Sequence, residues 1–452
     1  MVKVITYGTY DVLHFGHINL LKKAKALGDY LIVGVTSEDY DRSRGKINNQ
    51  QSLMERINAV RGTGLADEIV VEEYEGQKID DIRRYGVDIF TVGSDWEGRF
   101  DYLNEYCKVV YLPRTEGISS SEIRAENRKL KIGVVGENRT GRKFINECRM
   151  VNGGEIFGAC TEDGGAFYRD LSLPLYTVDY DVLLKEVDAV YIVSHPRFHY
   201  DYTKKALLAG KHVICESPVA EKEEQAEELF ALAKKEGLVL FDGIKTAYAT
   251  AYERMLLSLK SGVIGDVVSV DATCTGLKPI PKDDDAYLSG KWNSICSWGP
   301  IALLPVFQLL GTAYSSKRIL SAFADRKKTF DYFTKIEFVY PHAVASVKVG
   351  KGIKSEGDLV ISGTKGYIYI PAPWWKTDYY ELRFENQEDN KRIFYQLNGE
   401  GIRQEIVAFL KAIENSGAVG NVSEDISKAI SRVVEDLASG RDVFEIAASD
   451  GQ

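Results

Sequence analysis

Two histidines near the N-terminus, His14 and His17, have the residue type and spacing of a pair that handles phosphate. A strand-like apolar run at residues 2–7 ends before them, and a helical pattern of apolar residues follows them from Ile18. A helix N-terminus offers free N–H groups and a partial positive charge, and Gly16 leaves room for a phosphate to approach the backbone. One imidazole could bind ground-state oxygens while the other stabilises charge in the transition state. The alternative is a pair of hydrogen-bonded structural histidines.

Three other loops carry cationic, acidic or hydroxyl side chains directly after strand-like runs. They supply Arg44 and Lys46, then Asp95 and Trp96, and finally Arg114, Ser119 and Ser120. The last loop resembles the histidine loop in its expected use, because an arginine, a glycine and hydroxyl groups that can bind phosphate precede a helical pattern. A basic loop such as the first is also common as a purely solvated surface.

The elements around these loops alternate between strand-like and helical patterns. Strand-like runs occupy residues 2–7, 30–36, 68–71, 87–93 and 108–112, and capping boxes begin at Ser52 and Ser119. This alternation predicts an α/β fold with a parallel sheet covered by helices on both faces. Ligands bind such sheets at the carboxyl ends of the strands, so the loops should converge on one site.

The stretches GTYDVLHFGH, SDWEGRFDYL and YLPRTEGISSSEIR resemble the glycerol-3-phosphate cytidylyltransferase family over about residues 1–130. The resemblance implies transfer of CMP from CTP to glycerol 3-phosphate or a related polyol phosphate. The products would be pyrophosphate and CDP-glycerol, a precursor of teichoic acids or related surface polysaccharides. In this resemblance the catalytic residues are His14, His17, Arg114 and Lys46, and the nucleotide-binding residues are Thr9, Tyr10, Asp11, Gly16, Arg44, Asp95, Ser119 and Ser120. Mg²⁺ would accompany the CTP phosphates near Asp11, and the residues near the acceptor, the sugar or a dimer contact would be Lys78, Asp67 and Trp96.

Two positions depart from the pattern of that family. Gly64 stands where an arginine is usual, although Arg61 could reach the same space, and Ser94 replaces the first of two acids before Trp96. Both positions lie near the expected nucleotide or acceptor pocket. They therefore bear on the identity of the acceptor and leave the reaction type intact.

A second strand–turn–helix pattern begins at residue 131, and its turn runs from Gly136 through Asn138 to Gly141. The dinucleotide fingerprint has glycine at the middle position, so that the backbone can approach a pyrophosphate. Asn138 leaves two alternatives open, a structural turn and a cofactor cradle. The next strand-like run, residues 155–160, is followed by Glu162 and Asp163, which could bind a ribose hydroxyl or be ordinary loop acids.

The stretches SHPRFH, AGKHVICESP and LKSGVIGDVVSVDA resemble the Gfo/Idh/MocA oxidoreductase family from about residue 131 to 440. The resemblance implies three domains: a cytidylyltransferase domain at 1–130, a dinucleotide-binding Rossmann domain at 131–248, and an α/β domain with an open, mainly antiparallel sheet at 249–452. Strand-like runs at 266–274, 335–340, 343–349, 359–362 and 367–370, then helical patterns at 401–415 and 423–437, fit the third domain. NAD(P), where bound, would contact Gly136, Asn138, Gly141, Glu216 and Lys245.

The catalytic groups of that second family are replaced in this chain. Ser217 stands where the family has a lysine, and a serine cannot supply the protonated amine. Ile301 stands where a proton donor is expected, while Lys245 could substitute for the lysine or be an ordinary loop lysine. We therefore expect a degenerate module. The alternatives are an active NAD(P)-dependent dehydrogenase that makes the polyol phosphate, and a ligand-sensing scaffold with little catalysis.

The composition of the chain limits the classes of protein to which it can belong. Over 452 residues the net charge is −9, which argues against general nucleic-acid binding. No apolar run approaches the roughly 18 residues of a membrane span, and the N-terminus enters a strand without the pattern of a signal peptide. The six cysteines are scattered, with no CxxC pair. We expect a cytoplasmic protein and, from resemblance alone, a homo-oligomer (a dimer or a tetramer).

Overall fold

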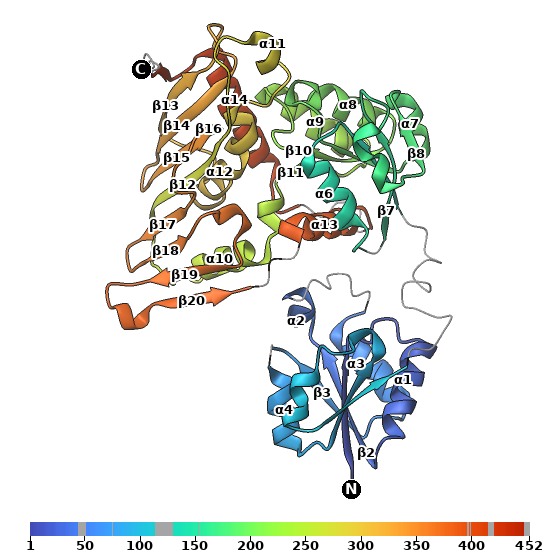
Figure 1. The fold of residues 1–452 in the computed structure, drawn as a ribbon. Coiled ribbons are helices and arrows are strands. Elements are labelled where there is room, and N and C mark those ends of the chain that lie inside the picture. The colour runs from blue at the N-terminus through green and yellow to red at the C-terminus, as the bar shows by residue number, and fades with distance from the viewer. Residues whose placement is uncertain are drawn as a thin grey trace. The chain divides into compact units, whose positions relative to one another are not determined.

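The computed structural model describes residues 1–43, 51–74, 76–113, 130–151, 153–395, 397, 399–414 and 420–446, except for the side chains of residues 39, 42, 43 and 95. The chain divides into two compact units, Met1–Lys129 and Leu130–Gln452 (Figure 1). Among the described residues, no helix has both the length and the apolar character that crossing a bilayer requires.

The first unit contains a five-stranded parallel sheet in the order β3-β2-β1-β4-β5. Its strands are β1 (Lys3–Gly8), β2 (Tyr30–Thr36), β3 (Glu68–Glu72), β4 (Ile89–Gly93) and β5 (Lys108–Leu112). Helices α1 (Phe15–Lys25) and α3 (Leu53–Gly62) pack on one face, α4 (Gln77–Tyr85) and the short η2 (Asp101–Glu105) pack on the other, and α2 (Glu38–Ser43) follows β2. The connections run in opposite directions from β1, so the crevice at the carboxyl ends of β1 and β4 is the expected ligand site.

The predicted α/β fold is confirmed, and the strand-like runs mark the strands because both faces of this sheet are covered. The histidines were predicted where a strand ends and a helix begins, and the structure agrees: His14 is the N-cap residue of α1 and His17 lies in its first turn. The predicted capping box at Ser52 is present, with its hydroxyl accepting from the backbone of Glu55. The second box, at Ser119, lies outside the described residues.

The second unit begins with a six-stranded parallel sheet in the order β11-β10-β9-β6-β7-β8. Its strands are β6 (Leu130–Val135), β7 (Gly154–Cys160), β8 (Leu175–Thr177), β9 (Ala189–Ile192), β10 (His212–Glu216) and β11 (Leu240–Gly243). The helices that alternate with them are α6 (Arg139–Cys148), α7 (Tyr180–Glu186), α8 (His199–Leu208) and α9 (Glu223–Lys235). The order reverses between β6 and β9, which again places a ligand crevice at the carboxyl edge of the sheet.

A ten-stranded sheet forms the rest of the second unit, in the order β20-β19-β18-β17-β12-β15-β14-β13-β21 with β16 paired to β12. The strands are β12 (Val267–Leu277), β13 (Ser316–Phe323), β14 (Asp331–Val339), β15 (Val344–Gly350), β16 (Gly352–Ile353), β17 (Leu359–Gly363), β18 (Tyr367–Ile370), β19 (Tyr379–Arg383), β20 (Lys391–Phe394) and β21 (Val443–Glu445). Only the β12–β15 and β13–β21 pairs are parallel, so the expectation of a mainly antiparallel sheet is confirmed for the described strands.

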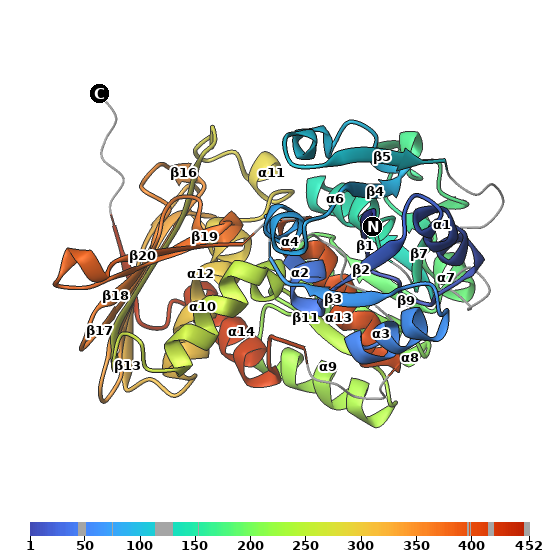
Figure 2. The same ribbon diagram turned by 90° about the horizontal axis from the view of Figure 1, so that it is seen from below.

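The described helices of this part of the unit are α10 (Thr250–Lys260), the short α11 (Asp285–Leu288), α12 (Ser294–Leu310), α13 (Ile402–Glu414) and α14 (Glu424–Ser439). Figure 2 shows α10, α12 and α14 along one face of the large sheet. Helix α13 returns to the first sheet of this unit and packs on α6. Helix α12 contains Pro300 and Pro305 and is nevertheless continuous, because tertiary packing outweighs the local penalty of the prolines.

Candidate functional site

The two histidines of the first unit lie together at the start of α1. His14 is the N-cap residue, and its Nδ1 accepts a hydrogen bond of 3.1 Å from the N–H of Gly16. The rings of His14 and His17 are stacked, with centroids 3.9 Å apart and planes 28° apart. Tyr10 meets His17 edge-on at 5.6 Å. The sequence prediction that both imidazoles adjoin one helix N-terminus therefore matches their placement.

The loop before the histidines has an unusual backbone. Tyr10 and Val12 have φ values of 54° and 46°, in the left-handed region that costs a non-glycine residue free energy. Tyr10 is only 2% exposed, and its ring lies against Gly8, where a Cβ would be 3.0 Å from it. Glycine at position 8 thus lets the chain turn closely over the tyrosine and approach the helix start.

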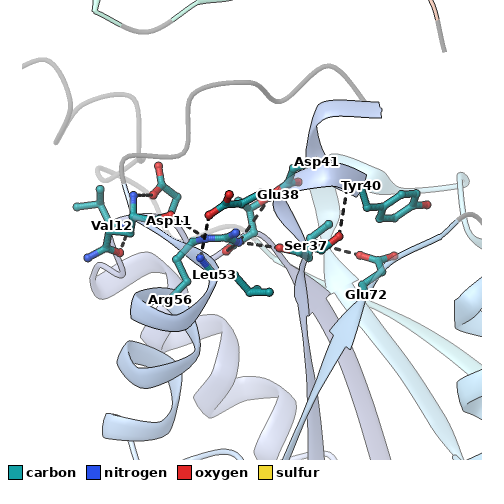
Figure 3. Close-up of polar contacts among 12 residues, drawn as sticks. Asp11, Val12, Ser37, Glu38, Tyr40, Asp41, Leu53, Arg56 and Glu72 are labelled. Carbon is teal, nitrogen blue, oxygen red and sulfur yellow. Dashed lines mark hydrogen bonds and ion pairs between the residues drawn. The ribbon is translucent and has the colours of Figure 1, made fainter. Parts of the chain in front are cut away.

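A buried arginine that the sequence reading missed holds this loop in place. Arg56 of α3 is fully buried, and its guanidinium donates to the carbonyl oxygens of Thr9 at 2.8 Å, Thr36 at 2.7 Å and Gln51 at 3.2 Å. Asp41, also fully buried, lies 3.8 Å from the same guanidinium and accepts from the hydroxyl of Thr9 at 3.0 Å. Figure 3 shows this network at the carboxyl ends of the strands. Arg56 thereby fixes the end of β1 relative to the end of β2.

Asp11 holds the other side of the loop. Its carboxylate is 5% exposed and accepts from the N–H of Gln51 at 3.0 Å, while the side chain of Gln51 accepts from the N–H of Val12 at 2.9 Å. These bonds tie the loop to the segment before α3. Within the described ranges, no three His, Cys, Asp or Glu side chains are grouped to hold a metal ion. Asp11 therefore has a structural role here, and its place near Mg²⁺ stays a prediction.

A pocket opens at the carboxyl ends of β1, β2 and β4. Its lining residues are Tyr7, Gly8, Thr9, Thr36, Glu72, Lys78, Phe90, Val92, Trp96 and Phe100. Lys78 is buried, pairs with Glu72, and lies over the Tyr7 ring at 4.8 Å and the Phe100 ring at 5.6 Å. Burial, followed by the hydrogen bond to Asp81, raises the pKa of Tyr7 far above its usual value, so Tyr7 remains a neutral donor.

The remaining predicted residues of the first unit divide into three groups. Thr9, Lys78 and Trp96 line the pocket, and Gly16 lies in the first turn of α1. Asp67 precedes β3 and accepts from the N–H of Leu31 at 2.6 Å, so it lies at the amino edge of the sheet, opposite the pocket. A dimer contact is the prediction for Asp67 that remains compatible with this placement. The predictions for Arg44, Lys46, Arg114, Ser119, Ser120 and the side chain of Asp95 lie outside the described residues.

In the second unit, the turn that opens α6 is filled by groups of the chain itself. The side chain of Asn138 accepts from the N–H of Gly141 at 2.9 Å and donates to the carbonyl of Val193 at 3.2 Å. The hydroxyl of Tyr168 accepts from the N–H of Asn138 and donates to the carbonyl of Gly136. A Cβ on Gly141 would meet that hydroxyl at 2.2 Å. The first and third glycines thus fit a dinucleotide-type turn, whereas the middle position lacks the open backbone that a pyrophosphate approaches.

Glu216 ends β10 and accepts a hydrogen bond from the hydroxyl of Tyr191. Burial raises the pKa of Glu216 from 4.5 to about 7, against the opposing effects of this hydrogen bond and of the charge on Lys245. Burial also raises the pKa of the neighbouring carboxyl of Glu405 well above its usual value. Glu216 and Glu405 are therefore two neighbouring carboxyls whose protonated forms are favoured by burial.

Lys245 is not an ordinary surface lysine, because its side chain is only 15% exposed. Its ammonium lies 2.5 Å from a carboxylate oxygen of Glu400, which also binds Lys143 at 2.7 Å and Lys376 at 3.1 Å. Burial alone would raise the pKa of Glu400, but these three lysines outweigh it and lower the pKa to about 2. Lys245 is therefore held by a permanent negative charge.

A parallel sheet of this strand order, with a histidine pair where α1 begins after β1, defines a nucleotidyltransferase-type domain. Residues 5–126 match the cytidylyltransferase-like family model. The glycerol-3-phosphate cytidylyltransferase of Bacillus spizizenii is 45% identical over 130 residues, which are 29% of this chain and 100% of that protein. Through this first domain, the chain belongs to the glycerol-3-phosphate cytidylyltransferase family.

The second unit has relatives of a different kind. Residues 130–244 match a Gfo/Idh/MocA model described as an oxidoreductase family with an NAD-binding Rossmann fold. The dTDP-3,4-didehydro-2,6-dideoxy-alpha-D-glucose 3-reductase of Actinomadura kijaniata is 36% identical over 110 residues, which are 24% of this chain and 33% of that protein. A 3-ketoreductase structure from the same organism, in complex with NADP and TDP-benzene, has a TM-score of 0.62 at 19% identity and covers 71% of this chain and 99% of that chain. This likeness shows the fold.

Replacing Arg56 by methionine is expected to destabilise the first unit by about 3–5 kcal/mol, because the carbonyl oxygens of Thr9, Thr36 and Gln51 lose their donor and Asp41 loses the guanidinium charge beside it. Arg61→Met is the matched control on the same helix, since Arg61 is exposed and bonds only to the side chain of Asn58 among the described residues. Hydrogen–deuterium exchange of peptides from β1 and β2, read by mass spectrometry, measures the change. Equal exchange in the two variants would contradict the role of Arg56.

The pKa of Glu216 predicts a pH dependence of the second unit. Between pH 4.5 and about 7 this carboxyl holds more protons in the folded than in the unfolded chain, so stability falls as pH rises through that interval. Glu216→Gln should reduce the fall by roughly 2–3 kcal/mol. Glu155→Gln, at an exposed position of the same sheet, should leave it unchanged. Urea unfolding at several pH values in this range measures the free energy of unfolding. If it falls with pH as steeply in Glu216→Gln as in the unchanged protein, the prediction is refuted.

Proposed function

We propose that the first unit transfers CMP from CTP to glycerol 3-phosphate, releasing pyrophosphate and CDP-glycerol. The observation that carries the proposal is the stacked His14–His17 pair at the start of α1, at the switch point of the sheet. The 45% identity over the full length of the Bacillus spizizenii enzyme supports both the reaction and its substrates. By the same likeness we propose CTP as the preferred nucleotide over ATP.

The reaction needs no covalent intermediate. A phosphate oxygen of the acceptor attacks the α-phosphorus of CTP in line, and pyrophosphate leaves from the opposite side. His14 and His17 would bind the phosphates and stabilise the charge that develops on them, together with Lys46, Arg114, Ser119 and Ser120. Mg²⁺, bound through the CTP phosphates, would neutralise negative charge. Asp11 would act mainly by holding the loop, since its carboxylate is buried and bonded to Gln51.

The acceptor would bind in the pocket beside β1 and β4. Lys78 supplies a cation there, and its pairing with Glu72 keeps the ammonium at a fixed place between the Tyr7 and Phe100 rings. Trp96 and Phe100, whose ring centroids are 5.9 Å apart, would enclose the glycerol carbons. A small polyol phosphate suits a pocket that combines one cation with aromatic walls.

For the second unit we propose a Rossmann domain at 131–248 and a substrate-binding α/β domain at 249–452 that retain binding but not dehydrogenase chemistry. The NAD-binding family match supports NAD(P) as a ligand, with Gly136, Gly141 and Glu216 beside it. Asn138 fills the middle of the turn, Ser217 replaces a lysine and Ile301 a proton donor, so we derive no hydride-transfer step. A cytoplasmic location and a homo-oligomer remain parts of this proposal.

Replacing His17 by alanine should lower the rate of CMP transfer on the order of 100–1,000-fold, because one donor to the transition state is lost. His342→Ala, a variant in the second unit, is the control and should keep full activity. Pyrophosphate release from CTP and glycerol 3-phosphate measures the rate, and circular dichroism shows that each variant is folded. A folded His17→Ala protein with near-normal turnover would contradict the assignment.

The second unit should show no oxidoreductase turnover on polyol phosphates. The measurement is nicotinamide absorbance with NAD⁺ or NADP⁺ and glycerol 3-phosphate, and with the reduced cofactors and dihydroxyacetone phosphate. Losing two acid–base groups, each worth roughly 100–10,000-fold, should leave no measurable rate. Steady turnover that disappears in Lys245→Ala but survives in His17→Ala would overturn this prediction and identify Lys245 as a relocated acid.

A further inference from the structure

Three lysines of the second unit gather without a carboxylate partner. Lys278 follows β12, Lys291 follows the short helix α11 (Asp285–Leu288), and Lys351 lies between β15 and β16. In the described part of the chain, none of the three forms an ion pair. Their charges interact nonetheless, because Lys278 and Lys291 both disfavour the protonated form of Lys351.

Lys351 is the fixed centre of this group. Its backbone N–H donates to the hydroxyl of Ser294 at 3.0 Å, and its carbonyl accepts from the N–H of Lys278 at 2.8 Å. Its ammonium donates to the carbonyl of Trp292. The side chain is half-buried, so its amino group is held in one position.

The surroundings of Lys351 compensate its charge only in part, through Asp331 and Cys296, and the net effect lowers its pKa. Burial lowers its pKa to about 8, and the charges of Lys278 and Lys291 act in the same direction. The opposing carboxylate nearby is Asp331, whose oxygens accept from the hydroxyl of Thr334 at 2.6 Å and the N–H of Ile295 at 3.2 Å. A partly desolvated cation among like charges costs free energy, and such groups concentrate where ligands bind.

A second group of lysines in the same unit is neutralised by a carboxylate of the chain. Glu400, held at a φ of 52°, brings its carboxylate to Lys143, Lys245 and Lys376. Three cations from three separate segments thus share an internal anion. Around Lys351 the nearby carboxylate, Asp331, is buried and bonded to Thr334 and Ile295, and no described carboxylate forms an ion pair with the three lysines, which leaves a place for an external anion.

The lysines also lie where a ligand would be expected. The segment that carries Lys291 is bound to the loop after β9, through His195 Nε2 with the carbonyl of Lys291 at 3.2 Å and Arg197 with the carbonyl of Ser289 at 3.2 Å. The rings of His199 and Trp292 meet at 5.4 Å. Strand β9 adjoins the reversal of strand order, so this is the ligand-binding edge of the parallel sheet.

We propose that Lys278, Lys291 and Lys351 form a subsite for the phosphate group of a small phosphate-bearing ligand at the carboxyl edge of the parallel sheet. Lysine suits this role, since an ammonium acts as a compact charge toward phosphate from any direction. The identification of the ligand as a polyol phosphate rests on the proposed function of the first unit. The two units would then bind the same class of compound, one to activate it and the other to sense it or hold it.

The test is chemical labelling of lysines in the full-length chain with acetic anhydride at pH 8, with peptides read by mass spectrometry. Labelling is followed without addition, with inorganic phosphate, with glycerol 3-phosphate and with uncharged glycerol. At ten times its dissociation constant, glycerol 3-phosphate should slow the labelling of Lys351 about tenfold. Lys335, a lysine of β14 paired with Glu337, should label at a constant rate, and glycerol should protect neither residue.

A second variant separates binding from folding. Lys351→Met keeps the aliphatic stem and removes the charge, so the protection of Lys291 by phosphate should be lost, whereas Lys335→Met should retain it. Unchanged labelling of Lys351 with both phosphate compounds would overturn the subsite. Protection by inorganic phosphate without protection by glycerol 3-phosphate would overturn the ligand class. Labelling requires no turnover, so these results do not depend on whether the first unit transfers CMP.

Discussion

The site of the first unit depends on a single buried guanidinium. Arg56 lies on α3, yet it donates to the carbonyl of Thr9 just after β1, to that of Thr36 at the end of β2, and to that of Gln51 before its own helix. A buried cation costs free energy unless its donors find acceptors, and these carbonyls with Asp41 supply most of them. These contacts hold the loop between β1 and α1 in place. Its turn, with positive φ at Tyr10 and Val12, brings His14 to the N-terminus of α1.

The second unit uses charge in two different ways within one fold. At Glu400 the chain provides its own counter-ion for three lysines, which fixes the contact of α6 with the segments around residues 245 and 376. Around Lys351 no described carboxylate forms an ion pair with the lysines, and the nearby Asp331 offsets their charge only in part. The first arrangement is structural. In our proposal, an anionic ligand completes the second arrangement.

Local patterns in the sequence were sufficient for the first sheet, because strands covered on both faces are continuous apolar runs and the histidine pair lies within four residues. They failed where partners are distant. Arg56 gave no signal, since its partners are backbone carbonyls that any residue carries. Lys351 meets Lys278 through a backbone contact, and reaches the segment of Lys291 through the carbonyl of Trp292, across long separations in sequence. Asp67 was assigned to the sugar, the acceptor or a dimer contact, and the first two are wrong because β3 places it at the opposite edge of the sheet.

The central claim is that the first unit, built around the histidine pair, moves a cytidylyl group to a polyol phosphate. The direct measurement is to incubate the full chain with glycerol 3-phosphate and CTP that carries a radioactive α-phosphate, and to separate the products. The account predicts that the label appears in CDP-glycerol while an equal amount of unlabelled pyrophosphate is released. Label that remains in CTP, or that is found only in free CMP, would contradict it.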